Sequence, residues 1–455
     1  MTPAVPARAY LESRREEFLR NLMEFLRIPS VSSDPARKAE VERAAHFVRD
    51  RLTAAGLRAE ELPTGGHPIV YGERVQGGRP TVLIYGHYDV QPPEPLALWR
   101  HGPFEPTVEG DNIVARGASD DKGQVYALIA GVEATLQSGS ARGVDLKVLI
   151  EGEEEVGSPN LAPFIRREKA RLRADVVVIA DTSQFAPGVP AITYGLKGLV
   201  YLELVVRGPK KDLHSGSYGG AVMNPANALT RMIAAFQGPF GRVAIPGFYD
   251  KVKPLEASER EEFARLPFRE SDFLEEVGAP RLWGEEGYTT LERQWARPTF
   301  DVNGLVSGHT GEGSKTVLPS EARGKFSMRL VPDQDPADIT RRAEEFIREI
   351  TPPGVKVEVL RHHGASPVLV PRGGPAVRAA AAAMARVFGR EPVFIREGGS
   401  IPVVNTFKNE LGVDSVLIGL GLPDDNAHSP NEKFSIPDFY RGMAVMVEFL
   451  AELGK

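Results

Sequence analysis

The chain has 455 residues, 42% hydrophobic and 25% charged, as in an ordinary globular protein with more than one domain. Lys and Arg number 55 against 61 for Asp and Glu, a net charge of −6, so we expect neither nucleic acid nor an anionic membrane as a partner. The sequence contains no cysteine. Disulfides, thiolate zinc sites, iron–sulfur clusters and a cysteine nucleophile are therefore excluded, and a bound metal would need His, Asp and Glu ligands.

The N-terminal part of the chain predicts two helices. Apolar residues at helical spacing predict a helix over residues 10–28 that ends at Pro29, and Asp34 followed by Pro35 predicts the start of a second helix that Gly56 closes. No stretch approaches the ~20 apolar residues of a membrane helix, and residues 1–10 lack the apolar run of a signal peptide. The expected location is the cytoplasm.

The next element is a buried strand over residues 81–90, which carries His87 and Asp89 near its C-terminal end. Side chains two positions apart in a strand point to the same side, so the imidazole and the carboxylate can touch. A carboxylate commonly orients a histidine that binds metal through its other ring nitrogen. A polar strand end that faces solvent is the alternative interpretation.

A long loop over residues 91–117 follows and leads to Asp120 and Asp121, immediately before a helix predicted over residues 124–137. Loops of this length are uncommon unless they have a function, and one that crosses a strand's C-terminal end often lines a pocket. Capping of the helix explains one of the two aspartates. Asp120, the more distant one, is then available for another role.

Two more strands end in acidic residues. The strand over residues 145–150 leads into an acidic run that includes Glu154 and Glu155, and the strand over residues 174–180 ends at Asp181. Crowded carboxylates repel one another unless cations neutralise them, although a solvated acidic loop is an alternative. Three strands thus deliver histidine or acid at their C-terminal ends, which is where open α/β sheets bind ligands.

Beyond Gly195 the pattern becomes that of an α+β domain, and the α/β pattern resumes in the last part of the chain. There His428 lies on a loop, between a strand over residues 415–418 and a helix over residues 435–453. We predict an α/β fold with a mixed sheet flanked by helices. Its discontinuous catalytic domain comprises residues 1–196 and 368–455, with an inserted domain over residues 197–367.

The acidic residues and histidines occur in an order that resembles the co-catalytic dizinc metallopeptidases. The shared blocks are His87-x-Asp89, Asp120-Asp121-Lys122-Gly123, Glu154-Glu155, Asp181 and His428. This superfamily includes carnosine dipeptidases, acetylornithine deacetylase, succinyl-diaminopimelate desuccinylase, aminoacylase and carboxypeptidase G. The blocks KDLHSGSYGG, REGGSIPV and AHSPNEK resemble the cytosolic dipeptidase branch. So does the long segment over residues 239–298, which is charged and which we expect to be irregular.

The resemblance implies a site for two divalent metal ions, with zinc expected and manganese or cobalt as alternatives. His87 and Asp181 would hold one ion, Glu155 and His428 the other, and Asp120 would bridge both. Three carboxylates and a bridging hydroxide balance the four positive charges. In this superfamily the peptide bond after the bridging aspartate, here Asp120-Asp121, is commonly cis.

The resemblance also implies a mechanism. Glu154 would act as the general base on a water shared by both ions, and Asp89 would support catalysis by orienting His87. His214 would bind the oxyanion, reaching across from the lid domain of a partner subunit, with Thr316 beside it. Arg329 would clamp the substrate's C-terminal carboxylate, assisted by Gly399 and Ser400.

Three functions follow from these residues. The first is a metal-dependent dipeptidase or short-peptide exopeptidase that works as a homodimer through its lid domain. The second is an N-acyl amino acid amidohydrolase, because the same machinery would cut an acyl amide. The third is a non-catalytic metal-binding dimer, against which Glu154 argues, since a general base has no use in a protein that only binds metal.

Overall fold

The computed structural model describes residues 4–140, 143–399 and 401–455. Two compact units make up the chain. Unit 1 contains the chain up to Tyr194 together with Val370–Ile395 and Val403–Lys455, and unit 2 contains Gly195–Leu369 and Arg396–Pro402. The assignment of residues 197–367 as a lid and dimerisation domain stays a prediction.

A mixed sheet forms the centre of unit 1. Within the described residues the sheet has nine strands: eight follow the order β1-β2-β6-β3-β7-β17-β8-β15, and the ninth, β16, pairs with β8. Strand β15 and the last residues of β8 and β16 belong to unit 2. Strand β3 is parallel to both β6 and β7, and β7 is parallel to β17, so these four strands end at the same edge. The bounds are β1 Arg58–Leu62, β2 Ile69–Arg74, β3 Thr81–His87, β6 Asp145–Glu151, β7 Val176–Ser183, β8 Ala191–Leu196, β15 Val368–Leu369, β16 Val393–Glu397 and β17 Ser415–Gly421.

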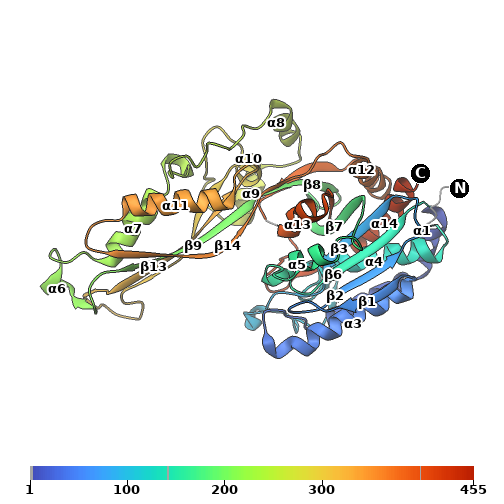
Figure 1. Ribbon diagram of the computed structural model, residues 1–455, viewed down its shortest axis with the longest axis horizontal. Coiled ribbons are helices and arrows are strands. Elements are labelled where there is room, and N and C mark those ends of the chain that lie inside the picture. Colours follow the sequence, from blue (N-terminus) through green and yellow to red (C-terminus); the bar gives the residue numbers. More distant parts are fainter. Residues whose placement is uncertain (1–3, 141–142, 400) are drawn as a thin grey trace. The chain divides into compact units, whose positions relative to one another are not determined.

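Helices cover both faces of this sheet (Figure 1). Val82 and Ile84 of β3 belong to one core cluster with residues of α1 to α4, α12 and α14. Tyr85 points to the opposite face, where its ring lies 5.3 Å from that of Phe407 in α13. The helix bounds in unit 1 are α1 Ala4–Ser13, α2 Arg15–Leu26, α3 Lys38–Ala55, α4 Lys122–Gln137, α5 Leu161–Arg167, α12 Pro375–Phe388, α13 Pro402–Leu411 and α14 Ile436–Leu453.

Unit 2 contains a four-stranded antiparallel sheet in the order β11-β13-β9-β14. Helices α7 and α11 lie along this sheet (Figure 1) and share its core. In that core the ring of Phe236 lies 5.0 Å from that of Phe300 and 5.1 Å from that of Phe326. The bounds are β9 Gly198–Arg207, β11 Thr299–Ser307, β13 Glu321–Leu330, β14 Lys356–Ala365, α7 Pro225–Ala235 and α11 Pro336–Ile350.

Short elements complete both units. In unit 1, β4 and β5 form a small sheet with β18, and in unit 2, β10 pairs with β12. Their bounds, with those of the short helices, are β4 Thr107–Glu109, β5 Asn112–Val114, β18 Lys433–Ser435, β10 Leu213–His214, β12 Val317–Leu318, α6 Ser215–Tyr218, α8 Ala257–Ala264, α9 Glu270–Val277 and α10 Thr290–Ala296.

Most long predicted elements are present, but some predictions are wrong. The single helix expected over residues 10–28 is broken at Arg14, whose backbone angles (φ −123°, ψ 15°) leave the helical region. The segment over residues 239–298, expected to be irregular, contains α8, α9 and α10. These helices have seven or eight residues, too short for a clear apolar period.

The Asp34 side chain accepts a hydrogen bond from the Ala36 amide and so caps a 3₁₀ turn over Pro35–Arg37. Helix α3 begins after this turn, at Lys38, and its N-cap Arg37 makes no capping bond, so the prediction that Asp34 and Pro35 start this helix is wrong. Gly56 ends α3 in the left-handed region, at φ 101°, where glycine is the favoured residue. Within the described residues, no helix combines the length and the apolar character needed to cross a membrane.

Candidate metal centre

His87 ends β3 and is fully buried. Its Nδ1 lies 3.1 Å from the backbone oxygen of Asp89 and 3.4 Å from that residue's carboxylate Oδ1, so the predicted pairing of the two residues is present. The carboxylate oxygens of Asp89 also accept hydrogen bonds from the amides of Glu154 (3.2 Å) and Glu155 (3.1 Å). Asp89 therefore fixes the imidazole and the acidic turn in one arrangement.

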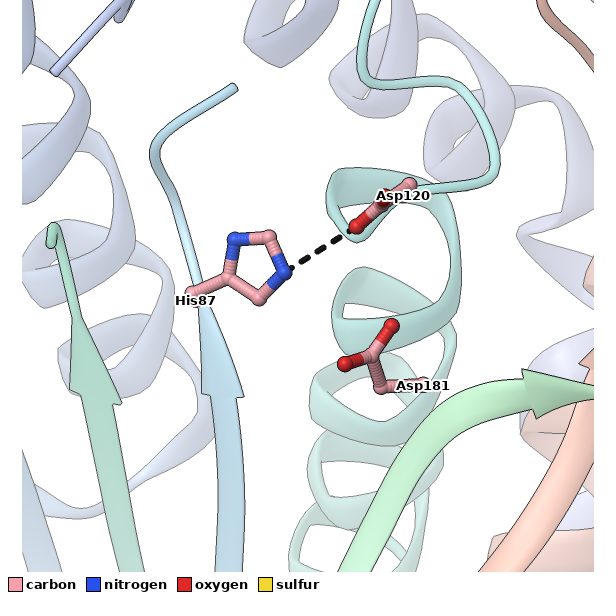
Figure 2. A group of neighbouring side chains, drawn as sticks. All are labelled: His87, Asp120 and Asp181. Atoms are coloured by element: carbon pink, nitrogen blue, oxygen red, sulfur yellow. Dashed lines mark ion pairs between the residues drawn. The ribbon is translucent and has the colours of Figure 1, made fainter. Parts of the chain in front are cut away.

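Asp120 faces His87 from the turn before α4. The Nε2 atom of His87 lies 3.2 Å from Asp120 Oδ1, and the described residues offer this buried nitrogen no hydrogen bond of acceptable geometry. Asp181, on β7, completes a group in which one potential ligand atom from each residue lies within 4.8 Å of the others. Figure 2 shows the three side chains directed toward a shared space. A buried imidazole nitrogen that faces two carboxylates is a donor arrangement that fits a divalent metal ion.

A second group shares Asp120 with the first. His428 Nε2 lies 2.8 Å from Asp120 Oδ2 and 3.4 Å from Glu155 Oε2, and the three residues again place potential ligand atoms within 4.8 Å. The two oxygens of Asp120 thus face two different histidines. Gln91 Nε2 donates to Glu155 Oε2 at 2.7 Å and orients that carboxylate.

The clustered carboxylates of this site favour the binding of cations. Burial, reinforced by Asp120, raises the pKa of Glu155 to about 9. Burial also raises the pKa of Asp181 well above its usual value and raises that of Glu154. Without a cation, Glu155 would hold its proton at neutral pH, because burial and the nearby negative charge of Asp120 disfavour its ionised form. The donor set of oxygen and imidazole nitrogen fits divalent cations such as zinc.

Neither aspartate of the Asp120-Asp121 pair caps α4 with its side chain, so the capping explanation is wrong. Asp121 occupies the N-cap position without a capping hydrogen bond. It is fully buried, and its Oδ2 instead accepts a hydrogen bond from the His87 amide at 3.3 Å. The peptide bond between the two aspartates is cis, as the resemblance implied.

The other predicted residues lie in unit 2. His214 and Thr316 are brought together there: the Ser215 amide donates to the Thr316 carbonyl at 3.0 Å, and His214 Nδ1 accepts from the Gly216 amide. Arg329 lies on β13, where burial lowers its pKa. Gly399 is exposed in the loop after β16, and Ser400 lies outside the described residues.

Sequence reasoning missed four residues that contact or hold the candidate metal ligands: Gln91, Arg116, Asp425 and Glu432. Gln91 contacts Glu155, and the other three form contacts with residues 117–120 or with one another. Glu432 lies inside the block AHSPNEK, but nothing in that block separates a buried acid from a solvated one. Only the folded arrangement shows which polar residues are buried.

The model of the family described as "Peptidase family M20/M25/M40" matches residues 83–452. The chain belongs to peptidase family M20/M25/M40. It is 34% identical over 462 residues to the Cys-Gly metallodipeptidase dug1 of Schizosaccharomyces pombe, with 97% of each chain covered. It is 30% identical over 467 residues to the human Beta-Ala-His dipeptidase, which covers 98% of this chain and 92% of the relative.

Among solved structures, the chain resembles the M20 family metallo-carboxypeptidase Sso-CP2 from Sulfolobus solfataricus, with a TM-score of 0.87 and 36% identity. That match covers 96% of this chain and 99% of the other. The predicted α/β fold and the predicted class, a metallopeptidase, are confirmed by these M20 relatives.

Binding of zinc or cobalt should raise the midpoint of thermal unfolding, because an ion that binds only the folded chain stabilises it. The gain is about 2.7 kcal/mol when the free ion is at 100 times its Kd. Asp120→Asn should lose most of this gain, since Asp120 belongs to both groups. Asp414→Asn, which changes an aspartate paired with Lys408 on the surface, is the matched control. Calorimetry of the two variants with and without metal checks the prediction, and an equal gain in both would contradict it.

Proposed function

We propose that this M20 peptidase is a dipeptidase that uses two divalent metal ions, with zinc as the native metal. The main observation behind this proposal is the position of Asp120. Its Oδ1 lies 3.2 Å from His87 Nε2, and its Oδ2 lies 2.8 Å from His428 Nε2. A carboxylate placed between two histidines in this way can bridge a pair of ions. The names of the relatives, a Cys-Gly metallodipeptidase and a Beta-Ala-His dipeptidase, support dipeptides as the substrate class.

The two groups of potential ligands support one assignment. His87 and Asp181 would hold one ion, Glu155 and His428 would hold the second, and Asp120 would contribute one oxygen to each. Oxygen and nitrogen donors suit zinc, while manganese and cobalt accept the same set. When bound, such an ion pair lowers the pKa of a water molecule and polarises the carbonyl of the scissile peptide bond.

Glu154 is the proposed general base. Its neighbour Glu155 supplies a ligand atom, whereas Glu154 belongs to neither group of ligands. The hydrogen bond from its amide to Asp89 Oδ1 fixes its backbone beside the site. Its carboxylate would take a proton from water as the water oxygen bonds to the carbonyl carbon. It would then return that proton to the amine nitrogen as the carbon–nitrogen bond breaks.

Substrate binding is assigned to residues of unit 2. The guanidinium of Arg329 would pair with the C-terminal carboxylate of a dipeptide, with Gly399 and Ser400 adding hydrogen bonds. His214 would donate a hydrogen bond to the oxyanion, with Thr316 beside it, both from the partner subunit of a homodimer. The pairing of β10 with β12, which places His214 next to Thr316 in unit 2, supports a shared role.

Strand β11 supports the proposed homodimer. It lies at the edge of the unit 2 sheet, and Val302, Leu305 and Val306 expose 42%, 56% and 54% of their surface. An edge strand with exposed aliphatic side chains is a ready surface for pairing with another chain. The dimer and the cytoplasmic location both remain proposals.

A carboxypeptidase is the second candidate, because the similarity to Sso-CP2 extends over nearly the whole chain. An N-acyl amino acid amidohydrolase would use the same ions and base on an acyl amide. A metal-binding dimer without activity would need no general base, so the position of Glu154 argues against it.

Glu154→Gln should reduce kcat by about 10²- to 10⁴-fold, because the variant cannot accept the proton of water. The metal content should stay at two ions per chain. Glu153→Gln is the matched control, since Glu153 pairs with Asn160 and should be dispensable for catalysis. Turnover assays together with metal analysis check both variants. Wild-type turnover by Glu154→Gln would refute the assigned role.

One panel of substrates separates the three candidate enzyme activities: dipeptidase, carboxypeptidase and amidohydrolase. We expect the highest kcat/KM on dipeptides with a free amino group. The values on N-acetyl amino acids, N-succinyl amino acids and N-blocked peptides should be about tenfold lower. A preference for N-blocked peptides would favour the carboxypeptidase, and a preference for acyl amino acids would favour the amidohydrolase.

Arg329→Met should lower kcat/KM on dipeptides by about 10- to 100-fold, since it removes a charged hydrogen bond, and should abolish discrimination against C-terminal amides.

Leu305→Lys should convert a dimer into a monomer, because it places a charge on the β11 edge. If His214 acts on the partner's site, turnover should fall with dimer content. Leu98→Lys, which changes an exposed leucine of unit 1, is the control. Light scattering coupled to gel filtration measures the mass. A fully active wild-type monomer would overturn the proposal.

A further inference from the structure

A second carboxylate, that of Glu432, organises the turn that carries Asp120. Glu432 is fully buried. Its Oε2 accepts hydrogen bonds from Arg116 Nη1 at 2.7 Å and from the Gly117 amide at 2.9 Å. Its Oε1 accepts from the amides of Ser119 at 2.9 Å and Asp120 at 3.0 Å. One carboxylate thus satisfies three backbone N–H groups of the turn, and a buried arginine balances its charge.

These contacts decide the backbone position of Asp120. Buried amide groups need an acceptor, and the three amides point at the same carboxylate. A neutral glutamine at this position could offer them only one carbonyl oxygen, and its NH₂ group would face N–H donors. Arg116 would then lose its buried anionic partner. The turn would therefore be expected to shift.

Glu432 also anchors the loop that carries His428. The backbone oxygen of Glu432 accepts a hydrogen bond from the Ala115 amide at 3.0 Å, directly before the pairing of β18 with β5. Within this loop Asn426, His428 and Asn431 have φ values of 56°, 60° and 61°. Side chains other than glycine rarely adopt this left-handed backbone, so contacts at the ends of the loop must hold it.

Asp425 holds the other end of the same loop to the same turn. Its Oδ2 accepts hydrogen bonds from Ser119 Oγ at 2.8 Å and from the Leu422 amide at 2.7 Å. Lys433 lies 3.3 Å from its Oδ1. The loop with His428 is thus tied at both ends to residues 117–120.

We propose that Glu432 is a positioning residue that sets the separation of Asp120 and His428, and so the affinity for metal. The inference rests on the proposed metal ligands. Glu432 places two proposed ligands, Asp120 and His428, of the ion that Glu155 also holds, but only one ligand, Asp120, of the other ion. Its loss should therefore weaken the binding of the ion beside Glu155 more than the binding of the other ion. Glu432 itself contacts neither substrate nor ion and acts through these two residues.

The test is titration of the metal-free full-length chain with Co²⁺ alone, followed by calorimetry and by the visible spectrum of the bound cobalt. Glu432→Gln should bind one of its two ions about 10- to 100-fold more weakly, the usual effect of losing a residue that supports metal ligands. The cobalt spectrum should change as well, since the coordination geometry changes. Ser119→Ala, which removes one hydroxyl from the contact with Asp425, should cause a smaller change in the same direction.

Glu133→Gln is the matched control, because Glu133 is also buried in unit 1 and accepts a hydrogen bond from Tyr10. It should lower thermal stability without altering cobalt affinity or the spectrum. Wild-type affinity and spectrum in a folded Glu432→Gln variant would overturn the proposal. If that variant does not fold, wild-type behaviour of Ser119→Ala would do so. A wild-type chain that binds no cobalt would instead refute the proposed function.

Discussion

The candidate metal centre depends on the close approach of several carboxylates to the buried imidazole of His87 and the exposed imidazole of His428. Asp120 is the point where these charges meet, since each of its oxygens faces a different histidine. Such an arrangement is costly for a protein without cations, because burial favours protonated acids. In the proposed function two divalent ions would neutralise these groups, and the free energy of binding the ions would offset the cost of burying the carboxylates.

The fold produces this arrangement through strand direction. Because β6, β3, β7 and β17 run parallel, the acidic turn after β6, His87, Asp181 and the loop with His428 all belong to one edge of the sheet. The turn with Asp120 precedes α4, which packs against this sheet. Asp89 and Glu432 then connect the ends of these elements through hydrogen bonds to backbone amides. Candidate ligands that are far apart in sequence are thus connected by hydrogen bonds to two buried carboxylates.

Much of this could be predicted from local patterns. Runs of β-branched and apolar residues located β3, β6 and β7, and Gly56 located the end of α3. The order of His87, Asp120, Glu155, Asp181 and His428 indicated the ligands, and the structure brings all five into two groups that share Asp120. Their roles remain proposals.

The rest depended on tertiary contacts. Short helices such as α8 and α10 carry too few residues for a periodic signal, so the segment was expected to be irregular. The helix expected over residues 10–28 was predicted as continuous, because the spacing of its apolar residues is the same on both sides of the break at Arg14. Gln91 and Glu432 look like ordinary polar loop residues until folding buries them beside the ligands. The burial of a single polar side chain is a property of the packed structure and not of its neighbours in sequence.

The most direct test of the account is a crystal structure of the zinc-loaded protein with anomalous scattering measured at the zinc edge. The account predicts two peaks about 3.5–4 Å apart, one beside His87 and Asp181 and one beside Glu155 and His428, with an Asp120 oxygen on each. A single peak, or two peaks of which Asp120 contacts only one, would contradict it.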